Sequence, residues 1–193
     1  MKIRPITTAL ILVFAGIAAG QEAFAQTSKQ QTSAVVIPTG GPCLFDFERG
    51  EVPNCVRESA TGHLFIAPEL LKDLEFDSHG LAAVLSPREG WMYVNRSGKV
   101  VIRGVPAMDN GADSFHDGLV RIVRNGKYGF ANRGGQVVIP AIYDGAMNFE
   151  NGRAAVCKGC ETSREGEHHF LSGGVWFRIN TKGTVLARIR PNS

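Results

Sequence analysis

Short stretches of alternating apolar and polar residues recur along this chain, and most of them end at glycine or asparagine. Three of them begin with glycine: GLAAV at 80–84, GLVRI at 118–122 and GRAAV at 152–156. In each, apolar residues stand two positions apart, which is the period of a β-strand. We predict that the last residue of each stretch lies in the core: Val84, Ile122 and Val156. Leu119, Arg121 and Arg153 then fall on the opposite face, toward solvent or a groove.

A second pattern follows each of these stretches and contains a tight turn. Its three examples are WMYVNRSGKVVI at 91–102, YGFANRGGQVVI at 128–139 and WFRINTKGTVLA at 176–187. Each places an aromatic residue four positions before an asparagine, and a glycine three positions after the asparagine. Because asparagine and glycine tolerate positive φ, Asn-x-x-Gly between apolar runs predicts a hairpin. The recurring aromatic residues are predicted to pack in the core or between repeats: Trp91, Tyr128 and Trp176.

Together the two patterns predict one repeated unit of three antiparallel strands. The connector PELLKDLEF at 68–76 favours a short helix with Pro68 at its start. A degenerate copy comes first, with Gly62 in the glycine place, Ser59 in the asparagine place and a first strand at 43–47. We therefore predict an all-β fold of about four tandem three-stranded antiparallel meander repeats, with units at about 42–66, 76–102, 115–139 and 149–187.

A single meander cannot bury its apolar face alone, so the units must pack on one another. We expect them to be stacked as a β-solenoid or an open propeller-like array. The segment NGKYGFANRGGQVVIPAIYDGAMNFENGRAAV at 125–156 resembles the WG-repeat family of bacterial proteins. Tyr128 stands where that family has tryptophan, and Met92 and Phe177 stand where it has glycine after the aromatic residue. The resemblance implies β-rich repeats and implies no catalytic set.

The first 25 residues have the pattern of a secretory signal peptide. Lys2 and Arg4 precede an apolar run at 9–20, and a small-x-small site follows at 23–25. We therefore predict a signal peptide at 1–25, a flexible linker rich in Gln, Thr and Ser at 26–41, and the repeat domain at 42–193. We expect the mature chain to be periplasmic or extracellular, without stable membrane insertion.

The charge balance excludes some classes of partner. After residue 25 the chain keeps 19 basic and 17 acidic residues, for a net charge of +2. This gives no electrostatic reason to bind nucleic acid or an anionic membrane. No Ser-His-Asp or paired-carboxylate pattern stands out, so we predict no catalytic residues and no cofactor. The connector aspartates are expected to be turn and loop residues: Asp109, Asp113, Asp117 and Asp144.

Four cysteines follow the predicted signal peptide: Cys43, Cys55, Cys157 and Cys160. An exported chain with an even number of cysteines favours disulfides, and four cysteines allow three pairings. We favour Cys43–Cys55 and Cys157–Cys160, because each pair is close in sequence. Closing a loop of the first size stabilises a fold by about 3 kcal/mol in the chain-entropy model.

The last repeat contains an insertion. Turn glycines 62, 98 and 135 are 36 and 37 residues apart, whereas glycines 135 and 183 are 48 apart. We predict that the insertion at 158–174 is a long polar loop that contacts a partner, through Lys158, Glu161, Arg164, Glu165, Glu167, His168 and His169. Three other interpretations of the same stretch stay open: the elongated polar tip of a hairpin, a redox Cys-x-x-Cys motif, and a zinc site that adds His168 and another histidine to the two cysteines.

We interpret the chain as an exported repeat scaffold that binds a protein or an envelope component and is not an enzyme. Three alternatives follow from the sequence. The chain is then a periplasmic immunity-type protein that neutralises a toxin, a cell-wall-acting hydrolase, or a metal-dependent module.

Overall fold

The computed structural model describes residues 41–44, 50–108, 111–165 and 168–190. The chain divides into two units: Met1–Ala34 lies outside the described residues, and Val35–Ser193 contains all of them. The predicted signal peptide and nearly all of the predicted linker therefore lie outside the described residues. None of the helices in the described ranges is long and apolar enough to cross a membrane.

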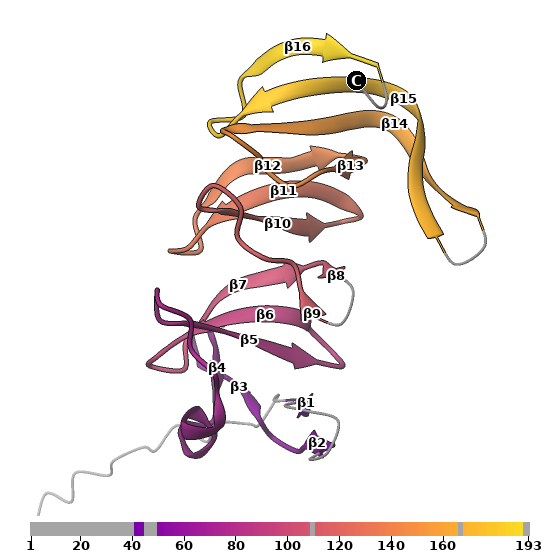
Figure 1. The fold of residues 1–193 in the computed structure, drawn as a ribbon. Helices are drawn as coiled ribbons and strands as arrows, with labels where there is room; N and C mark the ends of the chain where they lie inside the picture. Colours follow the sequence, from indigo (N-terminus) through magenta and orange to yellow (C-terminus); the bar gives the residue numbers. More distant parts are fainter. Residues whose placement is uncertain (1–40, 45–49, 109–110, 166–167, 191–193) are drawn as a thin grey trace, which may run out of the picture. The chain divides into compact units, whose positions relative to one another are not determined.

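The described chain is built mostly of short antiparallel strands (Figure 1). At its N-terminal end, β3 (Val56–Glu58) and β4 (Leu64–Ile66) form a two-stranded hairpin. The helix predicted after it is present as the 3₁₀-helix η1 (Pro68–Asp73), with its proline in the first turn. β1 (Cys43–Leu44) does not join this hairpin but pairs with β2 (Glu51–Val52) and with β5 of the next sheet. The prediction that the degenerate copy forms its own three-stranded meander is therefore wrong.

The physical reason is that this short hairpin and the next sheet share one core. Cys55, Val56 and Ile66 are buried in the same cluster as Val84 and Val94 of the next sheet. A two-stranded hairpin has too little apolar surface to be stable alone, so it packs on its larger neighbour, and β1 extends that neighbour.

Three further sheets follow the predicted meanders. In the first, β5 (Leu81–Ser86), β6 (Gly90–Asn95) and β7 (Val100–Val105) complete the order β2-β1-β5-β6-β7. A small hairpin of β8 (Ala107–Met108) and β9 (Gly111–Ala112) precedes the middle sheet. The middle sheet contains β10 (Leu119–Arg124), β11 (Lys127–Asn132) and β12 (Val137–Tyr143).

The last sheet has the order β13-β14-β15-β16. Its strands are β13 (Gly145–Ala146), β14 (Arg153–Glu165), β15 (His168–Asn180) and β16 (Val185–Ile189). The protein is thus mostly β, with several small antiparallel sheets, and its described residues form neither a closed barrel nor a solenoid.

The Asn-x-x-Gly turns close in the same way in each sheet. The side-chain oxygen of Asn95 accepts hydrogen bonds from the N–H groups of Ser97 and Lys99, at 3.1 and 3.0 Å. Asn132 and Asn180 make the equivalent bonds in the other two sheets. In the β3–β4 hairpin the hydroxyl of Ser59 takes the same place and accepts from the N–H of His63 at 3.1 Å.

The turn glycines lie against the third strand of the preceding unit. A Cβ atom on Gly98 would be 3.0 Å from the carbonyl oxygen of Ile66, and one on Gly135 would be 2.1 Å from that of Val101. Gly183 lies against the Ile139 side chain, which is 3.3 Å from a Cβ atom built on this glycine. Successive units therefore meet through one repeated contact, which a side chain at these glycines would obstruct.

Because the middle sheet packs against another sheet on each of its two faces, the residues of β10 predicted to face solvent are buried. Leu119 and Arg121 are each 7% exposed, so their predicted exposure is wrong, whereas Arg153 of the last sheet is exposed as predicted. The residues predicted as core vary in burial. Val84, Ile122, Val156 and Trp176 are buried, and Trp91 and Tyr128 are half-buried.

Candidate functional site

The insertion in the last repeat is a continuation of strands β14 and β15. The ladder between them runs from Arg153–Asn180 to Glu165–His168. β13 and β16 flank the near part of this hairpin, and neither pairs with it beyond Cys157 and Trp176. We call the far part, residues 161–165 and 168–172, the arm; Figure 1 shows it extending past the rest of the sheet. The interpretation of the insertion at 158–174 as an elongated hairpin is therefore confirmed, and its contact with a partner stays a prediction.

Glycines mark the place where the arm leaves the sheet. Gly159, Gly173 and Gly174 all have φ near +70° (+70°, +68° and +68°), a conformation that other residues adopt at a cost. A Cβ atom on Gly174 would lie 2.4 Å from the backbone nitrogen of Cys160. The two strands approach each other closely here and change direction (Figure 1). In the sequence these glycines are typical of a loop, so the length of the two strands could not be predicted from them.

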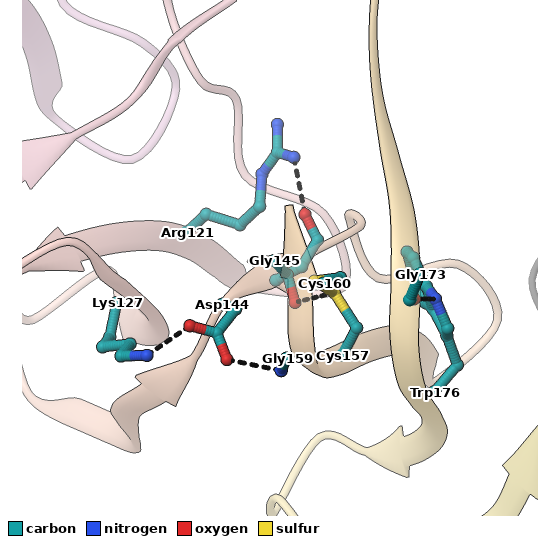
Figure 2. The surroundings of a disulfide bond; sticks show 10 residues. Arg121, Lys127, Asp144, Gly145, Cys157, Gly159, Cys160, Gly173 and Trp176 are labelled. Atoms are coloured by element: carbon teal, nitrogen blue, oxygen red, sulfur yellow. Dashed lines mark hydrogen bonds and ion pairs between the residues drawn. A yellow bond between two sulfur atoms is a disulfide. The ribbon is translucent and has the colours of Figure 1, made fainter. Parts of the chain in front are cut away.

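A disulfide spans this root of the arm. The chain contains Cys43–Cys55 and Cys157–Cys160, the pairing that closeness in sequence favours. The second joins two residues of one strand, with Cα atoms 5.9 Å apart, on either side of Gly159 (Figure 2). Both thiols are consumed by this bond, and the pair lies inside β14 and not at the start of a helix. Among the described residues no group of three His, Cys, Asp or Glu is placed to hold a metal ion.

Asp144 ties the root of the arm to the middle sheet. One carboxylate oxygen accepts from Nζ of Lys127 in β11, and the other accepts from the N–H of Gly159 at 2.8 Å (Figure 2). The hydrogen bond from Lys127 and then that from Gly159 lower the pKa of Asp144 below its ordinary value of 3.8. Asp144 is therefore a connector residue with a specific partner on each side.

Trp176 supports the disulfide from the neighbouring strand. Its ring is 4% exposed and packs with Cys157, Cys160 and Leu171. Its Nε1–H donates to the carbonyl oxygen of Gly173 at 2.9 Å, so the polar group of the buried ring is satisfied (Figure 2). The ring and the disulfide together fix the backbone from which the arm begins.

The predicted partner-contact residues gather on the arm and at its root. Lys158 and Glu161 are exposed, and the Lys158 ammonium lies 5.9 Å from the ring centre of Tyr143. The backbone pairs Arg164 with His169 and Glu165 with His168, so four of these residues stand together near the tip. Glu167 lies outside the described residues.

A second group of polar residues, which the sequence did not indicate, lines a depression of about 430 Å³ between β5–β6 and the turn after β11. Arg133 stacks on the ring of Phe115, with its guanidinium carbon 4.2 Å from the ring centre, and bonds to Asp77 at 3.0 Å. Burial tends to raise the pKa of Asp77, but the N–H groups of Leu81 and His79 and the charge of Arg133 together lower it.

Arg96 stacks on Phe76 in the same way one unit earlier, at 5.0 Å. The stacking contact recurs within each unit and holds its turn to its first residues, while the Arg133–Asp77 bond joins two units, so we assign the depression a structural role. The signal in the sequence was the arginine that follows the turn asparagine in both copies.

The comparisons with known proteins identify one repeat. Residues 128–159 match the family model of the WG containing repeat. This match begins in β11 and ends in β14, so it crosses from the middle sheet into the last sheet and includes Asp144 and Gly159. No curated protein and no solved structure matches the chain.

Proposed function

We propose that this WG repeat-containing protein is an exported binding module that recognises a protein or an envelope component through the arm, without catalysis. The observation that carries the proposal is the construction of the arm's root. A disulfide, a buried tryptophan and the Lys127–Asp144–Gly159 bonds all converge on the point where the two strands leave the sheet. A projecting hairpin held so firmly at its base suits recognition, because little conformational entropy is lost when a rigid element binds.

The units would form an open propeller-like array that holds the arm. In support, the turn glycine of each unit packs on the third strand of the unit before it. The matched repeat takes strands from two sheets, so the chain itself links one sheet to the next. Such an array presents its hairpins at fixed positions, which is the usual use of repeat scaffolds.

Export is part of the proposal. The signal-like pattern at 1–25 and the two disulfides both suit an oxidising compartment outside the cytoplasm. We therefore place the mature chain in the periplasm or outside the cell, with an extracytoplasmic partner.

The absence of catalysis is supported by the hydrogen bonds that three aspartates make. Asp77, Asp113 and Asp144 each bind a cation and backbone N–H groups. In the described part of the chain, every buried side-chain nitrogen and oxygen has a hydrogen-bond partner. Such satisfied carboxylates stabilise a fold, whereas a general base needs a free lone pair facing a substrate.

The test shortens the arm without disturbing its root. Thr162 and Leu171 are paired in the ladder between β14 and β15. In the shortened variant Asn-Gly replaces Ser163–Phe170 and forms a two-residue turn between them. The matched control keeps the length and composition of 163–170 but scrambles their order. Both variants and the mature chain are used to capture partners from the envelope fraction and the secretome.

A partner that binds the mature chain and is lost, by about tenfold or more, from both variants supports the arm as the recognition element. Retention of the same partners by the shortened variant would refute it. Turnover of a cell-wall substrate by the mature chain would refute the non-catalytic role separately.

A further inference from the structure

β16 is the free edge of the last sheet within the described residues, with β15 on one side and no strand on the other. Its five residues run from Val185 to Ile189, and the first four are exposed. Val185 is 53% exposed and Leu186 is 48% exposed, which is unusual for large apolar side chains on a strand. An edge of this kind offers unpaired backbone groups to another strand.

The equivalent strands of the preceding units are covered. Val100 and Val101 of β7 occupy the places of Val185 and Leu186. Val100 is 8% exposed, and Val101 lies against Gly135 of the following unit. Val185 and Leu186 are therefore exposed at positions where the corresponding residues of β7 are covered by other parts of the protein.

Exposed cationic side chains lie on and beside β16. Within 153–160 and 173–190 the chain has six charged residues and none of them is acidic: Arg153, Lys158, Arg178, Lys182, Arg188 and Arg190. Arg153 and Arg178 stand where earlier units have Leu119 and Phe130. Arg188 and Arg190 are two residues apart, which is the strand period. Arg153 and Arg178 thus replace apolar residues on one face of the last sheet, whereas Arg188, which pairs with Phe177, lies on the other face.

A depression lies beside the same strand. It has a volume of about 430 Å³ and is lined by Gly174, Val175, Trp176, Arg188, Ile189 and Arg190. Two arginines beside an apolar floor suit an acidic chain that also carries apolar side chains.

We propose that β16 binds an extended, acidic segment of a partner protein, which adds to the sheet as a further strand. Backbone hydrogen bonds along β16 hold the segment, Leu186 contacts its apolar side chains on one face of the sheet, and Arg188 and Arg190 select its carboxylates on the other face. This surface adjoins the root of the arm but includes none of the arm's own residues, so the inference does not depend on the function proposed for the arm.

The probe is a blocked peptide of about six residues in which valine and glutamate alternate, the usual length of a strand. Its binding to the mature chain is measured by calorimetry and by the shifts of the backbone amide signals. We expect saturable binding and shifts concentrated in residues 184–190. The lysine–valine counterpart should not bind. A copy of the probe with N-methyl groups on two adjacent central residues should also fail, because it keeps the charge but cannot form the ladder.

The variant is Arg188→Glu with Arg190→Glu, and its control is Lys72→Glu with Arg124→Glu. Both change the net charge equally, and the control residues are exposed on other elements. The first variant should weaken binding by about tenfold or more, whereas the control and the shortened-arm variant should retain it. Equal loss in both charge variants, or binding of the methylated probe, would overturn the proposal.

Two further outcomes would also overturn it. No saturable binding at millimolar peptide would mean that the arginines protect the edge from pairing. Self-association of the mature chain that the Arg188→Glu and Arg190→Glu variant abolishes would assign this edge to a second copy.

Discussion

Arg121 and Asp113 form a buried ion pair between a strand and the connector that precedes it. Nε and Nη2 of Arg121 donate to the two carboxylate oxygens of Asp113 at 2.9 and 2.8 Å. Nη1 donates to the carbonyl oxygen of Ala146 in β13 at 2.9 Å, which links the pair to the last sheet. The Asp113 side chain is 1% exposed and that of Arg121 is 9% exposed.

The other units have apolar residues at these two places. Asp113 stands two residues before the connector phenylalanine, and Leu74 and Met147 hold that position one unit earlier and one unit later. Arg121 stands three residues after the strand glycine, and Ala83 and Ala155 hold that position in the same two units. The ion pair of the middle unit therefore occupies two positions that are apolar in the neighbouring units.

Breaking this pair should cost far more than replacing it. Asp113→Ala alone leaves a buried guanidinium without its partner, so we expect a loss of about 3–5 kcal/mol in the free energy of unfolding. The double variant Asp113→Leu with Arg121→Met replaces both charged groups by apolar side chains of similar length and should be neutral or more stable by about 1–4 kcal/mol. Urea unfolding measures both. A double variant as unstable as the single one would show that the bond to Ala146 is the stabilising element.

Gly135 tests the repeated contact between units. Gly135→Ala puts a methyl group 2.1 Å from the carbonyl oxygen of Val101 at φ +83°. The control is Gly126→Ala, at φ +73° with nothing within 4 Å of the new atom. We expect about 1–2 kcal/mol of destabilisation from the left-handed backbone in the control, and about 1–3 kcal/mol more at Gly135 from the overlap. Equal effects in thermal unfolding would contradict close packing of the units at this turn.

Local features of the fold were predictable because their causes are local. Asn132 and Gly135 set a turn through bonds to residues within a few positions, so the pattern is visible in the sequence. Ser59 was recognisable in the same way, since its hydroxyl replaces the asparagine oxygen. The disulfide pairs were predictable from the short spacing between their cysteines.

Features that depend on neighbours in space were not predictable. Strand period assigns Arg121 to a face, but it does not say that another unit covers that face. β1 pairs with β5, which is distant in the sequence, and the degenerate first copy of the repeat has no pattern that predicts this partner. At the candidate site, the sequence located the insertion. It did not reveal that Asp144 and Trp176 hold its root, because those contacts connect different strands.

The two disulfides should stabilise the chain to different degrees. They close loops with sequence separations of 12 and 3, for which the chain-entropy model gives about 3 and about 2 kcal/mol. All four sulfurs are buried, so paired alanine replacements avoid leaving hydroxyl groups in the core. We expect chemical unfolding to rank Cys43→Ala with Cys55→Ala as the less stable variant. The reverse order would mean that the root of the arm contributes more than its loop length, through packing against Trp176.

Acid should destabilise the protein partly through Asp144. The bonds from Lys127 and Gly159 lower the pKa of this carboxyl in the folded state, whereas in the unfolded chain it keeps its ordinary value of 3.8. The unfolded chain therefore binds more protons as the pH falls. The stabilisation is fully present above about pH 4 and is lost as the pH falls through the folded-state pKa.

Asp144→Asn should reduce the stability at neutral pH and flatten its decline in acid. Lys127→Met is the matched variant, because it removes the main cause of the low pKa while keeping the carboxyl group. Melting temperatures between neutral and strongly acidic pH measure both effects. If both variants declined as steeply as the unmodified chain, the acid sensitivity would have to come from other carboxyl groups, of which Asp77 is the first to test.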